Sequence, residues 1–398
     1  MKIRSITGFL ALADPISASD LRALRDLVCA ARDDFARADF PIQTARVATQ
    51  TPADLAPRDL TRYARDLQTA SRTNAIDYAA LGALPGDHPL CAALPGALAA
   101  TESVFASAQI ASRGEGINLG SISAAARVIR QLADSTADGF GNLRFAALAN
   151  VSPHSPFFPA AYHDGGAPAF ALATEAAPLA VEAFSDAKNL DDARAHLVGA
   201  IERAGETIAR RATDLAARFG FRFVGIDFSL APYPEESRSI GAAIEKLIGV
   251  KFGEPGTLFA AAFLTDCINR AKFPRTGFSG LMLPVLEDTT LAARTPLYTV
   301  HSLLLYSAVC GTGLDTVPLP GDTRADVLSA ILLDLATLAV KLNKPLTARL
   351  MPIPGLQAGD ETNFNFEYFA NARVLDVGAN AVKFFGTDRQ VKFKTKDE

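Results

Sequence analysis

The run DARAHLVGAIERAGETIARRATDLAARFGFRFVGIDFS, residues 192–229, shows most clearly the pattern on which the fold depends. Apolar side chains recur at steps of three and four over residues 192–219, which places them on one face of a helix. Gly220 is typical of a helix end, and residues 222–228 then predict an apolar strand. A long amphipathic helix that leads directly into a short strand predicts an α/β fold.

The same alternation extends over nearly the whole chain. Strands are expected at residues 2–9, 43–49, 76–81, 104–112, 143–151, 279–286, 314–319 and 346–351, and helices at 19–39, 60–71, 91–100, 123–133, 239–248, 257–271, 300–309 and 328–342. Repeated strand–helix units predict parallel strands joined by right-handed crossovers, here about nine or ten of them. We therefore expect residues 1–398 to form a single α/β barrel domain. Residues 152–188 lack periodicity and predict a long loop or lid.

Composition excludes several classes of protein. The 398 residues carry a formal net charge of −4, and basic residues alternate with acidic ones along the expected helices, so no nucleic-acid partner is predicted. The 4 cysteines form no Cys-x-x-Cys pair, which argues against a disulfide framework and fits a reducing, cytoplasmic compartment.

Two segments resemble membrane or targeting sequences. Residues 1–13 begin with a basic residue and end in Ala-x-Ala, but Ser5, Thr7 and Gly8 interrupt the apolar run, so we interpret them as a first strand. Residues 328–342 form the most apolar expected helix, but they are too few to span a bilayer, which favours a core helix and no membrane partner.

Candidate functional residues follow the expected strands, because ligands gather at the carboxyl ends of parallel strands. Asp227 ends an apolar strand, where a general acid or base is often held, although a helix cap or an ion pair with Arg238 would explain it equally well. His163 is a candidate for proton transfer or for loop structure. The substrate-binding candidates, which would hold a small polar or anionic ligand, are Arg46, Ser229, Asp315 and Arg349.

A divalent metal is a further possibility, with no cofactor otherwise implied. Adjacent Glu287 and Asp288 would suit magnesium or calcium if a turn brought them together, but capping of a short helix at residues 291–293 is an equal alternative. His154 and His163 are nine residues apart, which is not the spacing of a helical zinc pair.

Cys310 opens the run CGTGLDTVPLPGD, residues 310–322. A thiol beside two glycines could be a nucleophile or a radical carrier in a tight loop. The alternative is that Gly311 simply ends a helix, in which case Cys310 would lie at the end of the barrel away from the catalytic loops.

Several of these runs resemble a family of bacterial and archaeal proteins of unassigned function, similar in fold to pyruvate formate-lyase and ribonucleotide reductase. The matching runs are IRSIT (3–7), FPAAY (158–162), DFSLAP (227–232), GFSGLMLPVLED (277–288), VCGTGLDTVP (309–318) and LTARLMPIPG (346–355). The resemblance implies a ten-stranded α/β barrel and a homodimer, and it implies no particular reaction.

In the related glycyl-radical enzymes a cysteine inside the barrel faces a glycyl radical near the C-terminus, so the resemblance implies Cys310 as its counterpart. Those enzymes carry Arg-Val-x-Gly followed by an aromatic residue. Here RVLDVGA, residues 373–379, has its glycine two positions later and alanine after it. The chain thus lacks a clear glycyl-radical motif, and we do not expect radical chemistry from it.

These observations lead to three hypotheses. The first is an enzyme of unassigned class that acts on a small polar or anionic metabolite at the carboxyl ends of the barrel strands, with Asp227 as acid or base and Cys310 or His163 assisting. The second is a metabolite-binding regulatory protein without turnover. The third is a metal-dependent lyase or hydrolase that uses Glu287, Asp288 and Asp227.

Overall fold

The computed structural model describes residues 1–378 and 390–393. The strands are β1 (Lys2–Leu10), β2 (Ile42–Thr49), β3 (Tyr78–Ala80), β4 (Leu84–Pro85), β5 (Val104–Ser112), β6 (Gly116–Asn118), β7 (Phe145–Ala149), β8 (Ala169–Glu175), β9 (Arg222–Asp227), β10 (Gly313–Pro320), β11 (Leu346–Ile353) and β12 (Gln390–Val391). The α-helices are α1 (Arg22–Ala36), α2 (Pro52–Leu55), α3 (Leu60–Thr73), α4 (Leu94–Ala99), α5 (Leu119–Ser135), α6 (Ala177–Ser185), α7 (Leu190–Phe219), α8 (Ile240–Ile248), α9 (Thr257–Arg270), α10 (Thr289–Ala293), α11 (Val300–Ser307) and α12 (Ala325–Lys341). Short 3-10 helices are η1 (Ala18–Leu21), η2 (Pro89–Ala93), η3 (Ala137–Arg144), η4 (Glu236–Arg238), η5 (Val285–Glu287) and η6 (Thr295–Leu297).

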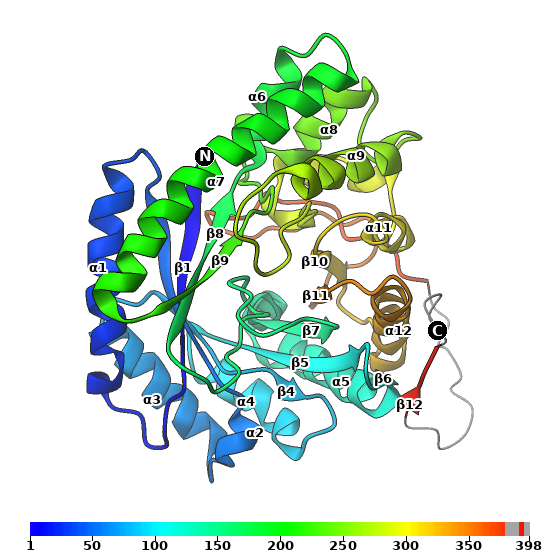
Figure 1. Cartoon of the computed structure of the whole chain (residues 1–398). Coiled ribbons are helices and arrows are strands. Elements are labelled where there is room, and N and C mark those ends of the chain that lie inside the picture. The colour runs from blue at the N-terminus through cyan, green and yellow to red at the C-terminus, as the bar shows by residue number, and fades with distance from the viewer. Residues whose placement is uncertain (379–389, 394–398) are drawn as a thin grey trace.

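The strands form one mixed sheet in the order β10-β11-β7-β5-β3-β2-β1-β8-β9 (Figure 1). Strands β1, β2, β3, β5 and β7 run parallel to one another. The pair β8 and β9 runs antiparallel to β1, and the pair β10 and β11 runs antiparallel to β7. The α/β class is confirmed, but the expectation that all strands are parallel is wrong. The carboxyl ends of β8, β9, β10 and β11 therefore lie beside the amino ends of the central strands.

The sheet is strongly curved. Arg4 on β1 and Arg349 on β11 both form ion pairs with the carboxylate of Glu287. These strands are five steps apart in the sheet, which would be about 24 Å if the sheet were flat. Curvature alone can bring both guanidinium groups to one side chain. No ladder of hydrogen bonds joins the outer strands β9 and β10 in the described residues, but isolated bridges link Arg275 to Ile226, Leu281 to Leu230, and Pro284 to Asp315.

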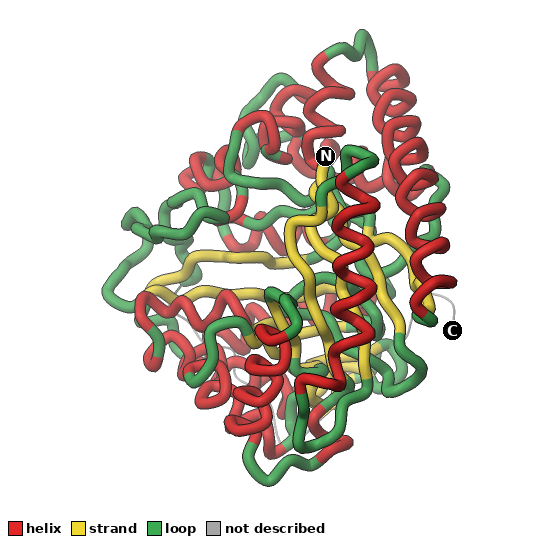
Figure 2. The backbone as a smooth tube through the Cα atoms, turned by 90° about the vertical axis from the view of Figure 1, so that its left-hand side faces the viewer, coloured by secondary structure: helices red, strands yellow, loops and turns green. Residues whose placement is uncertain are grey.

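Both faces of the sheet are buried. Helices cover the outer face, as Figures 1 and 2 show, and α1, α3, α5, α7 and α12 contact strands directly. The concave face carries small residues such as Ala48, Ala80 and Ala146, and it is filled by Phe158 and Ala160 from the segment between β7 and β8. This coverage explains the nearly continuous apolar runs that the strands show in sequence.

Two local expectations need correction, and two are confirmed. The stretch 152–188 is not one loop, because it contains β8 and α6; the loop proper is residues 150–168. Residues 279–286 form isolated bridges and η5 rather than a strand. The first strand and the helix end at Gly220, which has φ 72°, are confirmed. Among the described residues we find no helix with the length and apolar character needed to cross a bilayer.

Candidate functional site

The main candidate site is a cavity of about 380 Å³ inside the curved sheet, which we call the arginine cavity. It lies at the amino ends of the central parallel strands and at the carboxyl ends of β8 and β9. The expectation that the site would lie at the carboxyl ends of all strands is therefore wrong. Its polar lining includes Arg4, Arg46, Arg144, Asp227, Ser229, Glu287 and Arg349, and its aromatic lining includes Tyr78, Phe105, Phe140, Phe157, Phe158, Phe366 and Tyr368. The volume suits a small metabolite.

Asp227 lies at the end of β9 and is fully buried. Its carboxylate accepts hydrogen bonds from the Ser229 hydroxyl, from the backbone N–H of Phe278 at 3.0 Å and from that of Ser279 at 2.8 Å. Burial raises the pKa of Asp227, and these hydrogen bonds oppose the rise. Gly277 adopts φ 62°, and a Cβ there would lie 2.3 Å from Oδ2 of Asp227, so the turn that holds this carboxylate requires glycine.

Glu287, Arg349 and Asp315 form a buried chain of ion pairs. Arg349 Nη2 lies 2.6 Å from Glu287 Oε1, and Arg349 Nε lies 2.6 Å from Asp315 Oδ1. Arg4 pairs with the second oxygen of Glu287. Burial acts to raise the pKa of Glu287, but Arg349 and Arg4 together outweigh it and lower the pKa. Burial raises the pKa of Asp315, and the charge of Arg349 opposes the rise. The two guanidinium groups and the two carboxyl groups of this chain are thus partners of one another.

Arg46 is different from the other cavity arginines on β1 and β11. Its Nε donates to the Thr44 hydroxyl at 2.9 Å, and its guanidinium group lies over the rings of Phe158 at 5.1 Å and Tyr78 at 5.8 Å. No carboxylate within the described ranges, residues 1–378 and 390–393, pairs with it. Desolvation, followed by the charge of Arg4, lowers the pKa of Arg46 to about 10. At neutral pH the cavity thus contains a guanidinium ion that forms no ion pair with any described side chain, although the charge of Glu287 acts on it from a distance.

Arg144 contributes a further guanidinium group to the cavity lining. It precedes β7 and donates to the backbone carbonyls of Thr101 at 2.9 Å and Val104 at 3.2 Å. Sequence reasoning missed Arg144 and Arg4 because it favoured the carboxyl ends of the expected strands, and both arginines lie near the amino end of a strand. The signal that could have found them is an arginine at the amino end of an apolar strand, and it becomes informative only once the sheet is known to be mixed.

Of the sequence-predicted residues, the cavity brings together Arg46, Asp227, Ser229, Glu287 and Arg349. Asp315 lies behind Arg349 as its ion-pair partner. The paired-carboxylate metal site is not formed: Glu287 is engaged by two arginines, and Asp288 points elsewhere.

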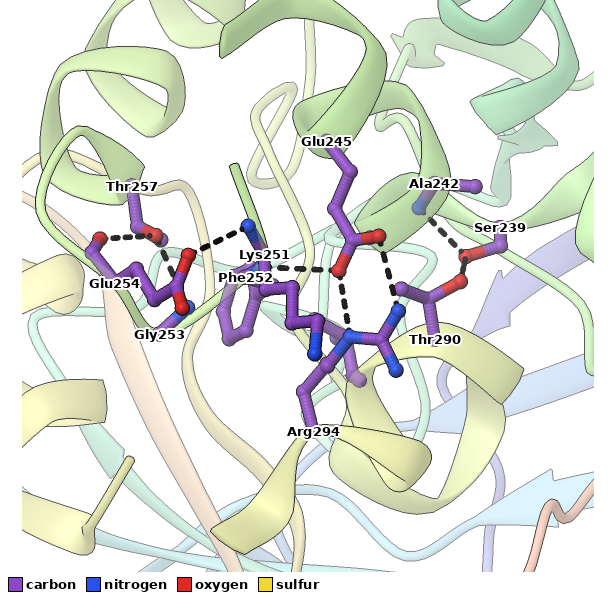
Figure 3. Close-up of polar contacts among 12 residues, drawn as sticks. Ser239, Ala242, Glu245, Lys251, Phe252, Gly253, Glu254, Thr257, Thr290 and Arg294 are labelled. Atoms are coloured by element: carbon purple, nitrogen blue, oxygen red, sulfur yellow. Dashed lines mark hydrogen bonds and ion pairs between the residues drawn. The ribbon is translucent and has the colours of Figure 1, made fainter. Parts of the chain in front are cut away.

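Asp288 caps two helices. Its carboxylate accepts from the backbone N–H groups of Ile240 at 2.6 Å and Leu291 at 2.9 Å, at the starts of α8 and α10. The hydroxyl of Ser239 donates to Asp288 as well, and Figure 3 shows Ser239 in contact with Thr290 and with the N–H group of Ala242. The alternative interpretation, helix capping, is the one that this geometry fits.

Cys310 and His163 lie outside the arginine cavity. Cys310 is buried just before β10, where it lines a second cavity of about 420 Å³ with Gly280 and Lys344. The Lys344 amine donates to the backbone carbonyl of Ser307 at 2.8 Å and to that of Cys310, which completes the end of α11. Gly378, the glycine of the C-terminal motif, is exposed.

His163 lies at the opposite end of the sheet, where its backbone N–H donates to the carbonyl of Thr49 at 2.9 Å. Its ring is fully buried and contacts the ring of His154. Neither imidazole reaches the arginine cavity. A joint role for His163 and Asp227 on one small molecule therefore has no geometric support.

Comparison with known proteins places the chain in a family that is described as uncharacterised. Residues 1–367 match the model of the family described as an uncharacterised ACR, DUF711, and the chain belongs to this family. The resemblance to such a family of bacterial and archaeal proteins is thereby confirmed, while the likeness to pyruvate formate-lyase remains a prediction.

Three curated relatives, each called UPF0210 protein, illustrate the extent of the match. The Pyrobaculum islandicum protein is 34% identical over 310 residues, 75% of this chain and 67% of the relative. The Pyrobaculum arsenaticum protein is 36% identical over 292 residues, 70% of this chain and 63% of the relative, so this chain spans less than two thirds of its length. The Halothermothrix orenii protein is 32% identical over 386 residues, 90% of this chain and 84% of the relative.

Proposed function

We propose that the chain is an enzyme that acts on a small anionic metabolite in the arginine cavity. One observation carries the proposal: Arg46 presents an unneutralised guanidinium ion to a cavity whose other acidic and basic groups on β11 and η5 pair with one another. Uncompensated charge in a partly dehydrated site is costly unless a ligand of opposite charge offsets it. A carboxylate or phosphate suits a guanidinium group, which binds either in bidentate fashion.

The aromatic lining adds a second property to the ligand. The rings of Tyr78 and Phe158 border the guanidinium group of Arg46, and the ring of Phe105 packs against both of them. An anion that also carries an apolar or planar portion would bury that portion against these rings. We infer that the substrate is a small carboxylate or phosphate with such a portion, held at one end by Arg46 and assisted by Arg144.

Asp227 is the candidate acid or base. It borders the cavity beside Ser229, and burial raises its pKa above that of an exposed carboxyl, which suits a group that exchanges a proton at higher pH than an ordinary aspartate. We infer that Asp227 exchanges a proton with the bound molecule, and the reaction class remains open.

A regulatory receptor without turnover is the second candidate. The observation that favours it is that both carboxylate oxygens of Asp227 already accept hydrogen bonds from neighbouring residues. A carboxylate held in this way would orient Ser229 and the 277–280 turn rather than react. Metal-dependent lyase or hydrolase chemistry through Glu287 and Asp288 has no support from their geometry.

The proposal is tested with a thermal-shift screen of the purified full-length chain against small carboxylates and phosphates. Neutral amides and alcohols of the same size serve as controls. We expect some anions to raise the melting temperature of the wild type and not of Arg46→Met. If anions stabilise both proteins equally, Arg46 does not bind the ligand and the assignment fails.

A second step separates the enzyme from the receptor. The stabilising anion is incubated with the protein, and the products are sought by mass spectrometry. Conversion by the wild type with binding but no conversion by Asp227→Asn supports the enzyme. Binding without any product supports the receptor, and unchanged conversion by Asp227→Asn removes Asp227 from the mechanism.

We also propose that the curved sheet is a ten-stranded barrel resembling the glycyl-radical enzyme barrel. The bridges from Arg275, Leu281 and Pro284 to the outer strands support it, because this segment stands between β9 and β10. A homodimer, implied by the family resemblance, and a cytoplasmic location, inferred from cysteine usage, complete the proposal.

A further inference from the structure

Two histidines and an aspartate converge at the end of the sheet opposite the arginine cavity. His154 and His163 lie in the loop of residues 150–168, and Asp164 follows His163 directly. The loop reverses direction between them, since the N–H group of His154 donates to the carbonyl of Tyr162 at 2.8 Å. The nine-residue separation that argued against a zinc pair in a helix therefore brings the imidazoles together in a loop.

The distances among the three donor atoms match those of metal ligands. His154 Nε2 lies 3.0 Å from His163 Nδ1 and 3.4 Å from Asp164 Oδ1, and His163 Nδ1 lies 3.3 Å from Asp164 Oδ1. Ligands bound to one ion at about 2.1 Å are about 3.0 Å apart in octahedral geometry and about 3.4 Å apart in tetrahedral geometry. One cation equidistant from the three atoms would thus make bonds of normal length.

The second nitrogen of His163 supports the same interpretation. His163 Nε2 lies 3.1 Å from the carbonyl oxygen of Gly166, so in a neutral ring the proton is on Nε2 and Nδ1 presents a lone pair. A backbone carbonyl at the second nitrogen is the usual partner of a metal-binding histidine. Asp164 Oδ1 is fixed in turn by the N–H group of Gly166 at 2.9 Å.

Without a cation, the three ligand atoms of His154, His163 and Asp164 cannot all form hydrogen bonds with one another. One proton on His154 Nε2 can serve either Nδ1 of His163 or Oδ1 of Asp164, which leaves two acceptors facing each other at 3.3 Å. The competing arrangement is a proton on Nδ1 of His163, which would make it an imidazolium paired with Asp164. A lone pair on Nδ1 of His163 allows a metal to bind, whereas a proton on Nδ1 prevents it, so metal binding distinguishes the two arrangements.

We propose that His154, His163 and Asp164 bind a divalent transition-metal ion such as Zn²⁺. Two imidazoles and one carboxylate are ligands that such ions prefer over the all-oxygen sets of magnesium and calcium. The carboxylate side is open, because the Asp164 side chain is 47% exposed, so water can complete the coordination. Because the ligands come from the loop that carries Phe157 and Phe158 into the arginine cavity, the ion would fix the loop that lines it.

The test uses the full-length chain without a histidine tag, stripped with a chelator and titrated with Zn²⁺ by calorimetry. We expect one ion per chain and a higher melting temperature when Zn²⁺ is bound. His154→Asn suits the backbone here, since His154 has φ 66° and asparagine tolerates that region. Asp164→Asn keeps an oxygen for Gly166. His196→Asn, on an exposed part of α7, is the matched control.

We expect His154→Asn to abolish stoichiometric binding and Asp164→Asn to weaken it at least about tenfold, with His196→Asn unchanged. Co²⁺ should give a visible d–d absorption band in the wild type that His154→Asn loses, and circular dichroism checks that each variant is folded. Binding well below one ion per chain, or equal binding by all four proteins, would overturn the proposal and favour the imidazolium.

Discussion

Two walls of the arginine cavity each contain an arginine, but the two arginines differ in their ion-pair partners. On the wall formed by β11 and η5, Arg349 is buried between Glu287 and Asp315, with 2.6 Å contacts to each. On the wall formed by β2 and β3, Arg46 has a hydroxyl and two aromatic rings as neighbours, and no carboxylate of residues 1–378 or 390–393 forms an ion pair with it. The difference indicates which arginine belongs to the fold and which is available to a ligand.

The physical reason is desolvation. Removing a guanidinium ion from water costs several kcal/mol, and a buried carboxylate can offset most of that cost. Arg349 has two such partners, so its charge is used within the protein. Arg46 has none in the described part of the chain, so an incoming anion is the group that can offset its cost.

The largest expected effect is a loss of stability when the ion pairs on the wall formed by β11 and η5 are broken. Arg349→Met would leave Glu287 and Asp315 buried without their shared cation. We expect the free energy of unfolding to fall by about 3–5 kcal/mol, the usual cost of removing one partner of a buried ion pair. Urea denaturation at neutral pH measures it.

The matched control for this substitution is Arg324→Met. Arg324 pairs with Asp326 at 2.6 Å, but its side chain is 61% exposed. Surface pairs of this kind contribute about 0–1 kcal/mol. If both substitutions cost equally little, the ion-pair chain does not hold the first wall together, and the contrast between the walls disappears.

The sequence predicted most elements of the fold but not the direction of the strands. Periodicity located helix α7 and most of the strands, because buried faces leave a regular apolar pattern. It missed β8, which lies in the stretch expected to be a loop or lid, and the short strands β4 and β6. Strand direction depends on which strands pair, and pairing joins residues as distant as Phe9 and Ala169. Assuming parallel strands throughout placed the site at the wrong end of β1 and β2.

The candidate site was partly predictable for the same reason. Asp227, Ser229 and Arg349 follow or lie on strands whose carboxyl ends do face the cavity, so the strand-end rule selected them. Arg46 was selected although it lies in the middle of β2 rather than at its carboxyl end. The pairing of Glu287 with Arg4 could not be predicted, because it depends on the curvature that brings β1 and β11 together.

A smaller effect concerns the pH dependence of Asp227, which lies between the two walls. Its pKa is raised in the folded state by burial, so the folded protein holds this proton more tightly than the unfolded chain does. As pH rises above about 4, the wild type should therefore lose stability relative to Asp227→Asn, by about 1.4 kcal/mol for each unit by which the pKa is raised. Urea denaturation from pH 4 to 8 measures this difference.

Asp326→Asn provides the control of opposite sign. The hydrogen bond from Arg324 lowers the pKa of Asp326, so the wild type should gain stability relative to that variant as pH rises through the same carboxyl range. A flat or reversed difference for Asp227→Asn would mean that its hydrogen bonds outweigh burial and that Asp227 stays ionised, which is a poor property for a group that donates a proton near neutrality.

The smallest expected effect is on the wall formed by β2 and β3. Here the sign of the change in the free energy of unfolding distinguishes the two walls. Arg46→Met keeps apolar contact with the rings of Tyr78 and Phe158 but removes a charge that forms no ion pair with the residues that the structure describes. We expect the free energy of unfolding to stay the same or to rise by up to about 1 kcal/mol, in contrast to the loss expected for Arg349→Met in the same cavity. Urea denaturation of both variants without added anions makes the comparison direct. A loss for Arg46→Met as large as that for Arg349→Met would show that Arg46 stabilises the fold, and the anion site would then need another cation on the cavity lining, such as Arg144.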